Sequence, residues 1–186
     1  MEFKKIQLNG FKSFAEKTDF LIEDGLTGIV GPNGCGKSNI VESLRWVMGE
    51  TSAKSMRGSG MEDVIFSGTS NKASKNIAEV LVSVANNNNE GPVQFREFEV
   101  VNVRRKIEKD KGSKFYINDK EVRARDVQMF FADLSTGAHS PSMISQGRIG
   151  ALVTAKPTDR RAILEEAAGI SGLHVRRHEA ELRLNA

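Results

Sequence analysis

The sequence predicts an α/β fold, and three neighbouring features carry this prediction. Residues 31–38 read G-P-N-G-C-G-K-S, which matches the G-x-x-x-x-G-K-S pattern of a phosphate-binding loop. The apolar run at residues 26–30 precedes the loop, as a buried parallel strand would. After the loop, apolar residues fall at helical spacing and predict a helix that Gly49 would end. These residues are Ile40, Val41, Leu44, Val47 and Met48. Strand, loop and helix in this order are the context that the motif requires.

The residue types of the loop explain how it would hold a nucleotide. Glycines allow the backbone to wrap closely around phosphates with its N–H groups pointing inward. The helix that begins there adds its positive end. We expect Lys37 to reach the β- and γ-phosphates and the Ser38 hydroxyl to ligate Mg²⁺. The alternative is an ordinary glycine-rich turn in front of a helix.

Composition places limits on the kind of protein. The chain has 186 residues, 39% of them hydrophobic, which suits one ordinary domain with a real core. Its formal charge of +3 allows nucleic-acid contact without arguing for it. The single cysteine, Cys35, lies inside the loop and fits a reducing compartment. No signal peptide is visible, and no run approaches the ~20 apolar residues of a membrane span. We therefore expect a cytoplasmic protein without a membrane segment.

The elements before and after the loop helix follow from alternation and turn signals. Ile6 and Leu8 alternate with polar neighbours and predict a short strand, a second strand is expected at 18–22, and residues 23–25 turn the chain. Residues 50–60 are polar and small and predict an exposed loop, followed by a semi-apolar piece at 61–66. Three strands, at 78–84, 95–107 and 114–118, predict an antiparallel meander. The sheet that carries the loop is expected to be mixed.

The last third of the chain is predicted to be mainly helical. Residues 122–134 have a broadly helical arrangement, and a short strand at 143–147 leads to Gln146. Pro157 suits the first turn of a helix that continues to residue 168 and ends at Gly169. Residues 171–184 predict one more helix, too short to identify a coiled coil by its periodicity.

Three further patterns have both a functional and a plainer interpretation. Glu23 and Asp24 follow an apolar stretch, as Mg²⁺-binding acids would, but a surface hairpin is favoured. His174 and His178 lie four apart without a nearby acid in a metal-site frame, so a solvated helix face is favoured over a metal pair. A basic run at 104–114 could contact DNA phosphates, although a solvated hairpin tip is favoured.

The chain lacks half of a nucleotide-hydrolysing site. No acidic strand follows Gln146, and no general base for water is visible. Residues 134–137, L-S-T-G, resemble the signature of ATP-cassette proteins, but they precede Gln146, whereas in those proteins the signature lies after the glutamine. The sequence therefore predicts a composite site that other residues must complete.

Several motifs in order resemble the N-terminal head segment of a structural maintenance of chromosomes (SMC) protein of the bacterial or archaeal type. They are F-K-S-F at 11–14, the loop and Asn39, K-S-M-R-G at 54–58, M-E-D-V-I-F at 61–66, I-S-Q-G-R at 144–148 and the stretch 156–169. The resemblance covers essentially the whole chain. It implies an ABC-type split ATPase in which residues 1–170 form the N-terminal half of the head and residues 171–186 begin a coiled coil.

The resemblance also implies roles for individual residues. Gln146 would contact Mg²⁺ and the attacking water, and Arg57 would lie near the phosphates and link hydrolysis to DNA. Lys12 and Ser13 would contact the nucleotide, and Asp63 would lie on its adenine side. Cys35 departs slightly from the family pattern. With the catalytic Lys37, the implied ATP-binding set includes Pro32, Asn33, Gly34, Cys35, Gly36, Ser38 and Asn39.

The same resemblance implies partners and leaves alternatives open. The implied partners are the C-terminal half-head of the same protein, a second SMC copy, a kleisin with accessory subunits, and DNA bound largely without sequence preference, in a cytoplasmic, nucleoid-associated machine for chromosome partition and condensation. The chain alone would bind ATP with little or no turnover. The first alternative is a DNA-repair or recombination ATPase with the same split head. A transporter cassette and a purely structural docking platform are the others.

Overall fold

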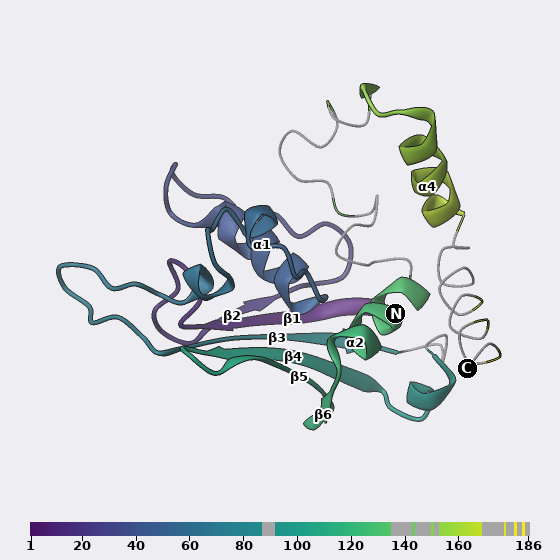
Figure 1. Ribbon diagram of the computed structural model, residues 1–186. Helices are drawn as coiled ribbons and strands as arrows, with labels where there is room; N and C mark the ends of the chain where they lie inside the picture. The colour runs from purple at the N-terminus through teal and green to yellow at the C-terminus, as the bar shows by residue number, and fades with distance from the viewer. Residues whose placement is uncertain are drawn as a thin grey trace. The chain divides into compact units, whose positions relative to one another are not determined.

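The computed structural model describes residues 1–86, 92–134 and 153–168, together with residues 143, 150, 177, 181 and 184 (Figure 1). The chain forms two compact units, residues 1–127 and residues 128–186. The predicted boundary between residues 170 and 171 falls outside the described residues. So does the predicted strand that leads to Gln146. No helix in the described part of the chain has the length and apolar character needed to cross a membrane.

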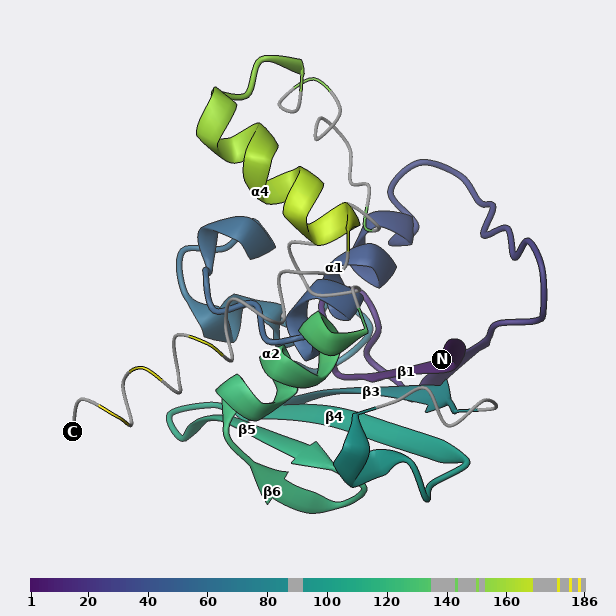
Figure 2. The same cartoon turned by 90° about the vertical axis from the view of Figure 1, so that its right-hand side faces the viewer.

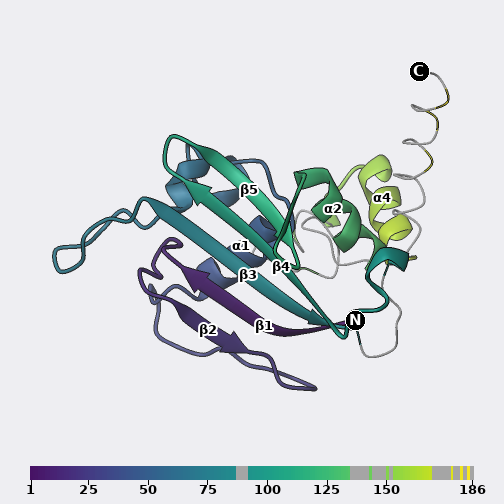
Figure 3. The same cartoon turned by 90° about the horizontal axis from the view of Figure 1, so that it is seen from below.

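The described residues of the first unit form a six-stranded antiparallel sheet, seen from below in Figure 3. The strand order is β2-β1-β3-β4-β5-β6. The predicted meander is confirmed as β3, β4 and β5, while the short β6 was not predicted. The strands are β1 (Glu2–Asn9), β2 (Thr18–Leu21), β3 (Ile77–Ala85), β4 (Val100–Glu108), β5 (Gly112–Ile117) and β6 (Lys120–Val122).

Alternation along the strands gives the sheet one apolar face. Ile6 on β1 pairs with Val82 on β3, which in turn pairs with Val103 on β4, and all three side chains are buried. Successive residues of a strand point to opposite faces, so their polar neighbours face the other side. β4 begins at Val100 rather than near residue 95, because Val93–Phe95 form a short 3₁₀ helix, η3.

Helix α1 (Lys37–Val47) lies against β3 and β4 on this apolar face (Figure 1). Trp46 is fully buried, and its ring lies 5.4 Å from that of Phe11. The predicted end of the helix is confirmed, since Gly49 has a φ of +98° and its N–H donates to the carbonyl of Trp46. The phosphate loop is thereby attached to a helix that the core holds firmly.

The predicted parallel strand before the loop is not formed. Residues 26–30 have no strand structure, and the exposed fractions of Leu26 and Val30 are 100% and 94%. A buried parallel strand needs neighbours on both sides, and the described residues provide none. All strand pairs in the described part of the chain are antiparallel, so the mixed sheet predicted for the loop strand is absent from it.

The segment after α1 is more ordered than the predicted exposed loop. It contains the 3₁₀ helices η1 (Lys54–Met56) and η2 (Met61–Val64), and Glu50 and Met56 are buried. The sequence gives few apolar residues here, so the burial of Met56 against the rest of the fold was not predicted.

Two predicted helices in the C-terminal part are confirmed. Helix α2 (Ala124–Asp133) has Val127, Phe130 and Phe131 buried. Helix α4 (Pro157–Ala167) begins at the predicted proline (Figure 2). The coiled-coil start at residues 171–186 lies almost entirely outside the described residues, so it stays a prediction.

Candidate nucleotide-binding site

The phosphate loop wraps around its own lysine. Lys37 Nζ donates hydrogen bonds to the carbonyls of Gly31, at 2.6 Å, and Pro32, at 2.7 Å. Gly34 and Gly36 have φ values of +85° and +96°, which favour glycine. A β-carbon on Gly36 would lie 2.4 Å from Ser13 Oγ, so this glycine also allows a close approach between two segments. The loop therefore brings the opening segment of the chain against the start of α1.

The opening segment is held in a tight turn. The N–H groups of Phe11 and Phe14 donate to each other's carbonyls, at 3.0 and 2.8 Å. Lys12 sits at the tip with a φ of +47°, and its N–H donates to the carbonyl of Val64 at 2.7 Å. This turn directs Lys12 and Ser13 toward α1.

Five polar side chains from three segments form one network next to the loop. Lys12 Nζ contacts Glu42 Oε2 and donates to the carbonyl of Met56 at 2.5 Å. Arg57 Nε pairs with Glu42 Oε1, and Arg57 Nη2 donates to Asn39 Oδ1 at 3.1 Å. Asn39 Nδ2 donates to Ser13 Oγ at 2.9 Å. We call this set the cation network; its members are Lys12, Ser13, Asn39, Glu42 and Arg57.

Glu42 is the member of the cation network that was not predicted. Its exposed fraction is 8%, and buried carboxylates are rarely found without a cationic partner. It follows Asn39 by three residues and so shares its face of α1. That spacing and the burial of α1 could have indicated that Glu42 belongs to the site. The sequence did not indicate which cations would reach the Glu42 carboxylate. Because each of its oxygens already holds a cation, Glu42 is poorly suited to take a proton from water.

Asp63 fixes a turn in this structure. Its Oδ2 accepts hydrogen bonds from the N–H of Ser59 at 2.7 Å, from the Ser59 hydroxyl at 2.9 Å and from the N–H of Gly60 at 2.9 Å. The bond from the Gly60 N–H, followed by those from Ser59, lowers the pKa of the Asp63 carboxyl. These contacts leave the predicted adenine-side role of Asp63 as a prediction.

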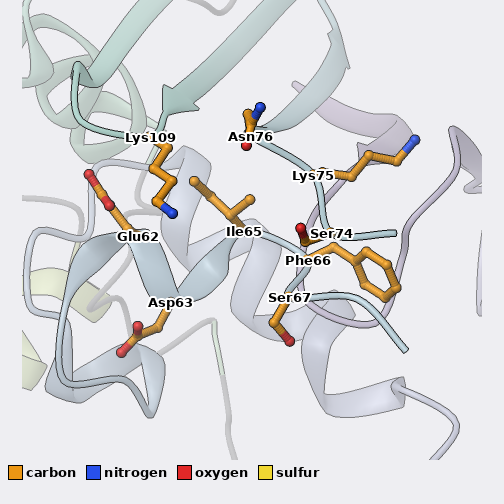
Figure 4. A pocket seen from close by; sticks show the side chains of 9 residues that line it. All are labelled: Glu62, Asp63, Ile65, Phe66, Ser67, Ser74, Lys75, Asn76 and Lys109. Atoms are coloured by element: carbon orange, nitrogen blue, oxygen red, sulfur yellow. The ribbon is translucent and has the colours of Figure 1, made fainter. Parts of the chain in front are cut away.

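A cavity of about 550 Å³ lies beside Asp63 and η2 (Figure 4). Lys75 and Lys109 are among its lining residues, and the Lys75 ammonium points away from the other labelled side chains. No residue of the loop, 31–38, lines it, so it is separate from the phosphate site. Its lining residues are Glu62, Asp63, Ile65, Phe66, Ser67, Ser74, Lys75, Asn76 and Lys109.

The metal ligands remain predictions. Gln146 lies outside the described residues, as do the three histidines. The described part of the chain contains no group of three His, Cys, Asp or Glu side chains able to hold a metal ion. Ser38, in the first turn of α1, is the remaining predicted ligand, so a bound Mg²⁺ would take most of its ligands from phosphate oxygens and water, as this ion commonly does.

The described part of the site is suited to binding an anion, but it lacks the groups needed to catalyse a reaction by itself. Three cationic side chains, Lys12, Lys37 and Arg57, belong to or adjoin a loop at the positive end of α1. The acid among them is already paired. Such an arrangement can bind and orient a polyphosphate, whereas a base for water is lacking among the described members of the site.

Comparison with known proteins gives consistent matches. The family model described as the RecF/RecN/SMC N terminal domain matches residues 2–148. Over all 186 residues the chain is 55% identical to the chromosome partition protein Smc of Rhodopseudomonas palustris. It is 57% identical over the same length to the protein of that name from Cereibacter sphaeroides. The chain spans 16% of the length of each of these two relatives.

Solved structures with the same fold are head domains. An Smc head bound to the C-winged helix domain of ScpA matches with a TM-score of 0.85 and 30% identity, covering 92% of this chain and 52% of that one. The Smc head of Pyrococcus furiosus, with an extended coiled coil and bound to the C-terminal domain of ScpA, matches with a TM-score of 0.84 and 29% identity. That match covers 99% of this chain and 46% of the other. The predicted α/β fold of the ABC-ATPase type is thereby confirmed.

Proposed function

Since the chain belongs to the SMC family, as its N-terminal head segment, we propose that it is the ATP-binding half of a composite ATPase that works in chromosome partition. The observation that carries the proposal is the phosphate loop at the start of α1, with Lys37 inside it and Arg57 and Lys12 tied to the same helix. ATP and Mg²⁺ are the proposed ligands, with the phosphates at the loop and Mg²⁺ at Ser38 and Gln146.

The exposed apolar segment before the loop, residues 26–30, supports the proposal that a partner covers it. Leu26 and Val30 are almost fully exposed, and covering each would contribute about 2 kcal/mol. A C-terminal half-head that supplies neighbouring parallel strands would bury this segment and convert it into the predicted strand. It would also bring the acidic strand and the base that the described site lacks.

The chromosome-partition function is favoured over the DNA-repair alternative by the relatives. Two of them, at 55% and 57% identity over the whole chain, carry the name chromosome partition protein Smc. One matching solved chain, with a TM-score of 0.76 and 30% identity and covering 90% of this chain and 99% of that one, comes from work on ATP-driven dimerization and DNA-stimulated activation of SMC ATPases. We accordingly propose a second SMC copy and DNA as partners, and a kleisin by analogy with the ScpA-bound heads. The working place would be the nucleoid.

The test separates binding from turnover. The chain alone should bind ATP weakly and hydrolyse almost none, and adding the matching C-terminal half-head should produce hydrolysis. Lys37→Ala should abolish nucleotide binding in both preparations. Full turnover by the chain alone, or ATP binding that survives Lys37→Ala, would contradict the proposal.

A further inference from the structure

We propose that Glu42 is a positioning residue that presents the Arg57 guanidinium to the phosphates of ATP. This inference rests on the proposed function, because it takes the phosphates to lie at the loop. Glu42 itself would not touch the nucleotide. It would act through Arg57, whose place in the site it determines.

The position of Glu42 makes it a rigid anchor. It lies on α1, the helix that begins at Lys37, so its distance from the phosphate loop is set by helix geometry. Its side chain is only 10% exposed, and its two oxygens bind different cations, Oε2 that of Lys12 and Oε1 that of Arg57. A carboxylate held in this way has little freedom to follow a mobile partner, so the partner adopts the position that the carboxylate defines.

One part of the Arg57 guanidinium is held by protein contacts, and another part is free to bind an anion. Nε is taken by Glu42 and Nη2 donates to Asn39, but the side chain is still 59% exposed. A guanidinium has five N–H donors, and these contacts use two of them. The remaining donors can bind an anion without breaking the contacts that orient the group, which is the geometry that phosphate recognition by arginine requires.

Lys12 has a different task in this arrangement. Its side chain is only 13% exposed, and its ammonium joins Glu42 to the carbonyl of Met56, the residue before Arg57. Arg57 itself has a left-handed backbone with φ of +55°, which is unfavourable for a non-glycine residue. Glu42 therefore holds Arg57 twice, by its side chain directly and by its backbone through Lys12.

Positioning has a characteristic kinetic result. An arginine on a free loop would sample many rotamers and would have to be ordered as the reaction proceeds. A guanidinium that is already fixed avoids this cost, so it lowers the activation free energy most where negative charge develops in the transition state. In the full-length protein, Glu42→Gln keeps the size of the side chain but removes the charge that holds both cations. We expect kcat for ATP hydrolysis to fall by about tenfold, with the Kd for ATP changed by less than about threefold.

A double variant distinguishes positioning from an independent effect. Arg57→Ala alone should lower kcat at least as much as Glu42→Gln, and the two changes together should cost no more than Arg57→Ala alone. Glu79→Gln is the matched control, because Glu79 pairs with Arg104 on the sheet, outside the cation network, and it should leave kcat unchanged. Thermal unfolding of each variant, followed without nucleotide, checks that the fold is kept.

Should Glu42→Gln prevent folding, Glu42→Asp takes its place, since it keeps the charge that pairs with both cations but draws the carboxylate back by one methylene group. The Arg57 guanidinium would then be displaced, so kcat should fall while the Kd for ATP changes little, and an unchanged kcat in a folded Glu42→Asp protein would overturn the positioning role. Losses from Glu42→Gln and Arg57→Ala that simply add, or an unchanged kcat in a folded Glu42→Gln protein, would overturn the positioning role. A wild-type protein that binds no ATP, or one that does not need Lys37, would instead overturn the proposed function.

Discussion

The guanidinium of Arg105 donates a hydrogen bond from Nη1 to the main-chain carbonyl of Trp46, at 2.8 Å. Nη1 also donates to the carbonyl of Glu50 at 2.6 Å, and the guanidinium stacks on the rings of Trp46 and Phe115, at 4.5 Å from each centroid. Arg105 is 3% exposed, and its burial lowers its pKa to about 10. A single β4 side chain therefore binds one carbonyl in the last turn of α1 and one just after it, and so ties the helix that carries the phosphate loop to the sheet.

Removing Arg105 should destabilise the fold. Arg105→Met fills part of the space but removes the hydrogen bonds to two buried carbonyls and the charge stacked on two rings, so we expect a loss of about 3 kcal/mol in the free energy of unfolding. Urea titration measures this loss. Arg104→Met is the neighbouring control, because the Arg104 side chain is only half-buried and pairs with Glu79 and Asp119, so its loss should cost below about 1 kcal/mol. Equal losses would contradict the role given to Arg105.

Gly36→Ala should disrupt the loop more than Gly34→Ala does. Both positions have a positive φ, which costs an alanine about 1–2 kcal/mol. At Gly36 the new methyl group would also meet Ser13 Oγ at 2.4 Å, whereas at Gly34 no atom lies within 4 Å. ATP binding measured by titration calorimetry should therefore be weaker for Gly36→Ala. Adding Ser13→Ala should recover part of the difference, and no recovery would show that the close contact is unimportant.

Asp63 should make stability depend on pH in the acid range. Its folded pKa is lowered from the ordinary value of 3.8 by the hydrogen bonds from Gly60 and Ser59. Its contribution is therefore complete above the unfolded pKa and is lost as the pH falls through the folded pKa. We expect Asp63→Asn to be less stable than the wild type at pH 7, and the difference to be smaller at an acid pH below the ordinary value of 3.8. Unfolding curves at both pH values provide the measurement, and a constant difference would refute it.

The exposed segment before the loop should matter for assembly and not for the stability of this chain. Changing Leu26 and Val30 to serine removes apolar surface that is already in water, so urea unfolding of the chain should be almost unchanged. Binding to the C-terminal half-head should weaken by at least about tenfold, given ~2 kcal/mol for each buried side chain. Leu21→Ser, on the edge strand β2 with 66% exposure, is the control expected to leave that binding intact. Unchanged binding by the double variant would remove the segment from the interface.

Some of the fold was readable because it depends on neighbours in sequence. Alternation predicted β1 and β3, β-rich composition and turn signals predicted β4 and β5, and the loop predicted where α1 begins. The prediction of a strand at residues 26–30 was wrong, and the apolar run that suggested the strand also explains the error. An apolar run indicates that burial would be favourable, but it does not supply the strands that would bury Leu26 and Val30.

The candidate site likewise has one part that depends on neighbours in sequence and one part that depends on distant residues. The phosphate loop, with Lys37 and Ser38, is a local motif of adjacent residues, so the sequence alone identified it, and the roles of these two residues stay predictions. Glu42 meets Lys12, thirty residues earlier in the chain, and Arg57, fifteen residues later. Whether such distant charges meet depends on how two left-handed turns and a helix pack together. Only the tertiary structure decided that one buried carboxylate holds both cations, because the Coulomb attraction between charges depends on their distance in space and not on their spacing in sequence.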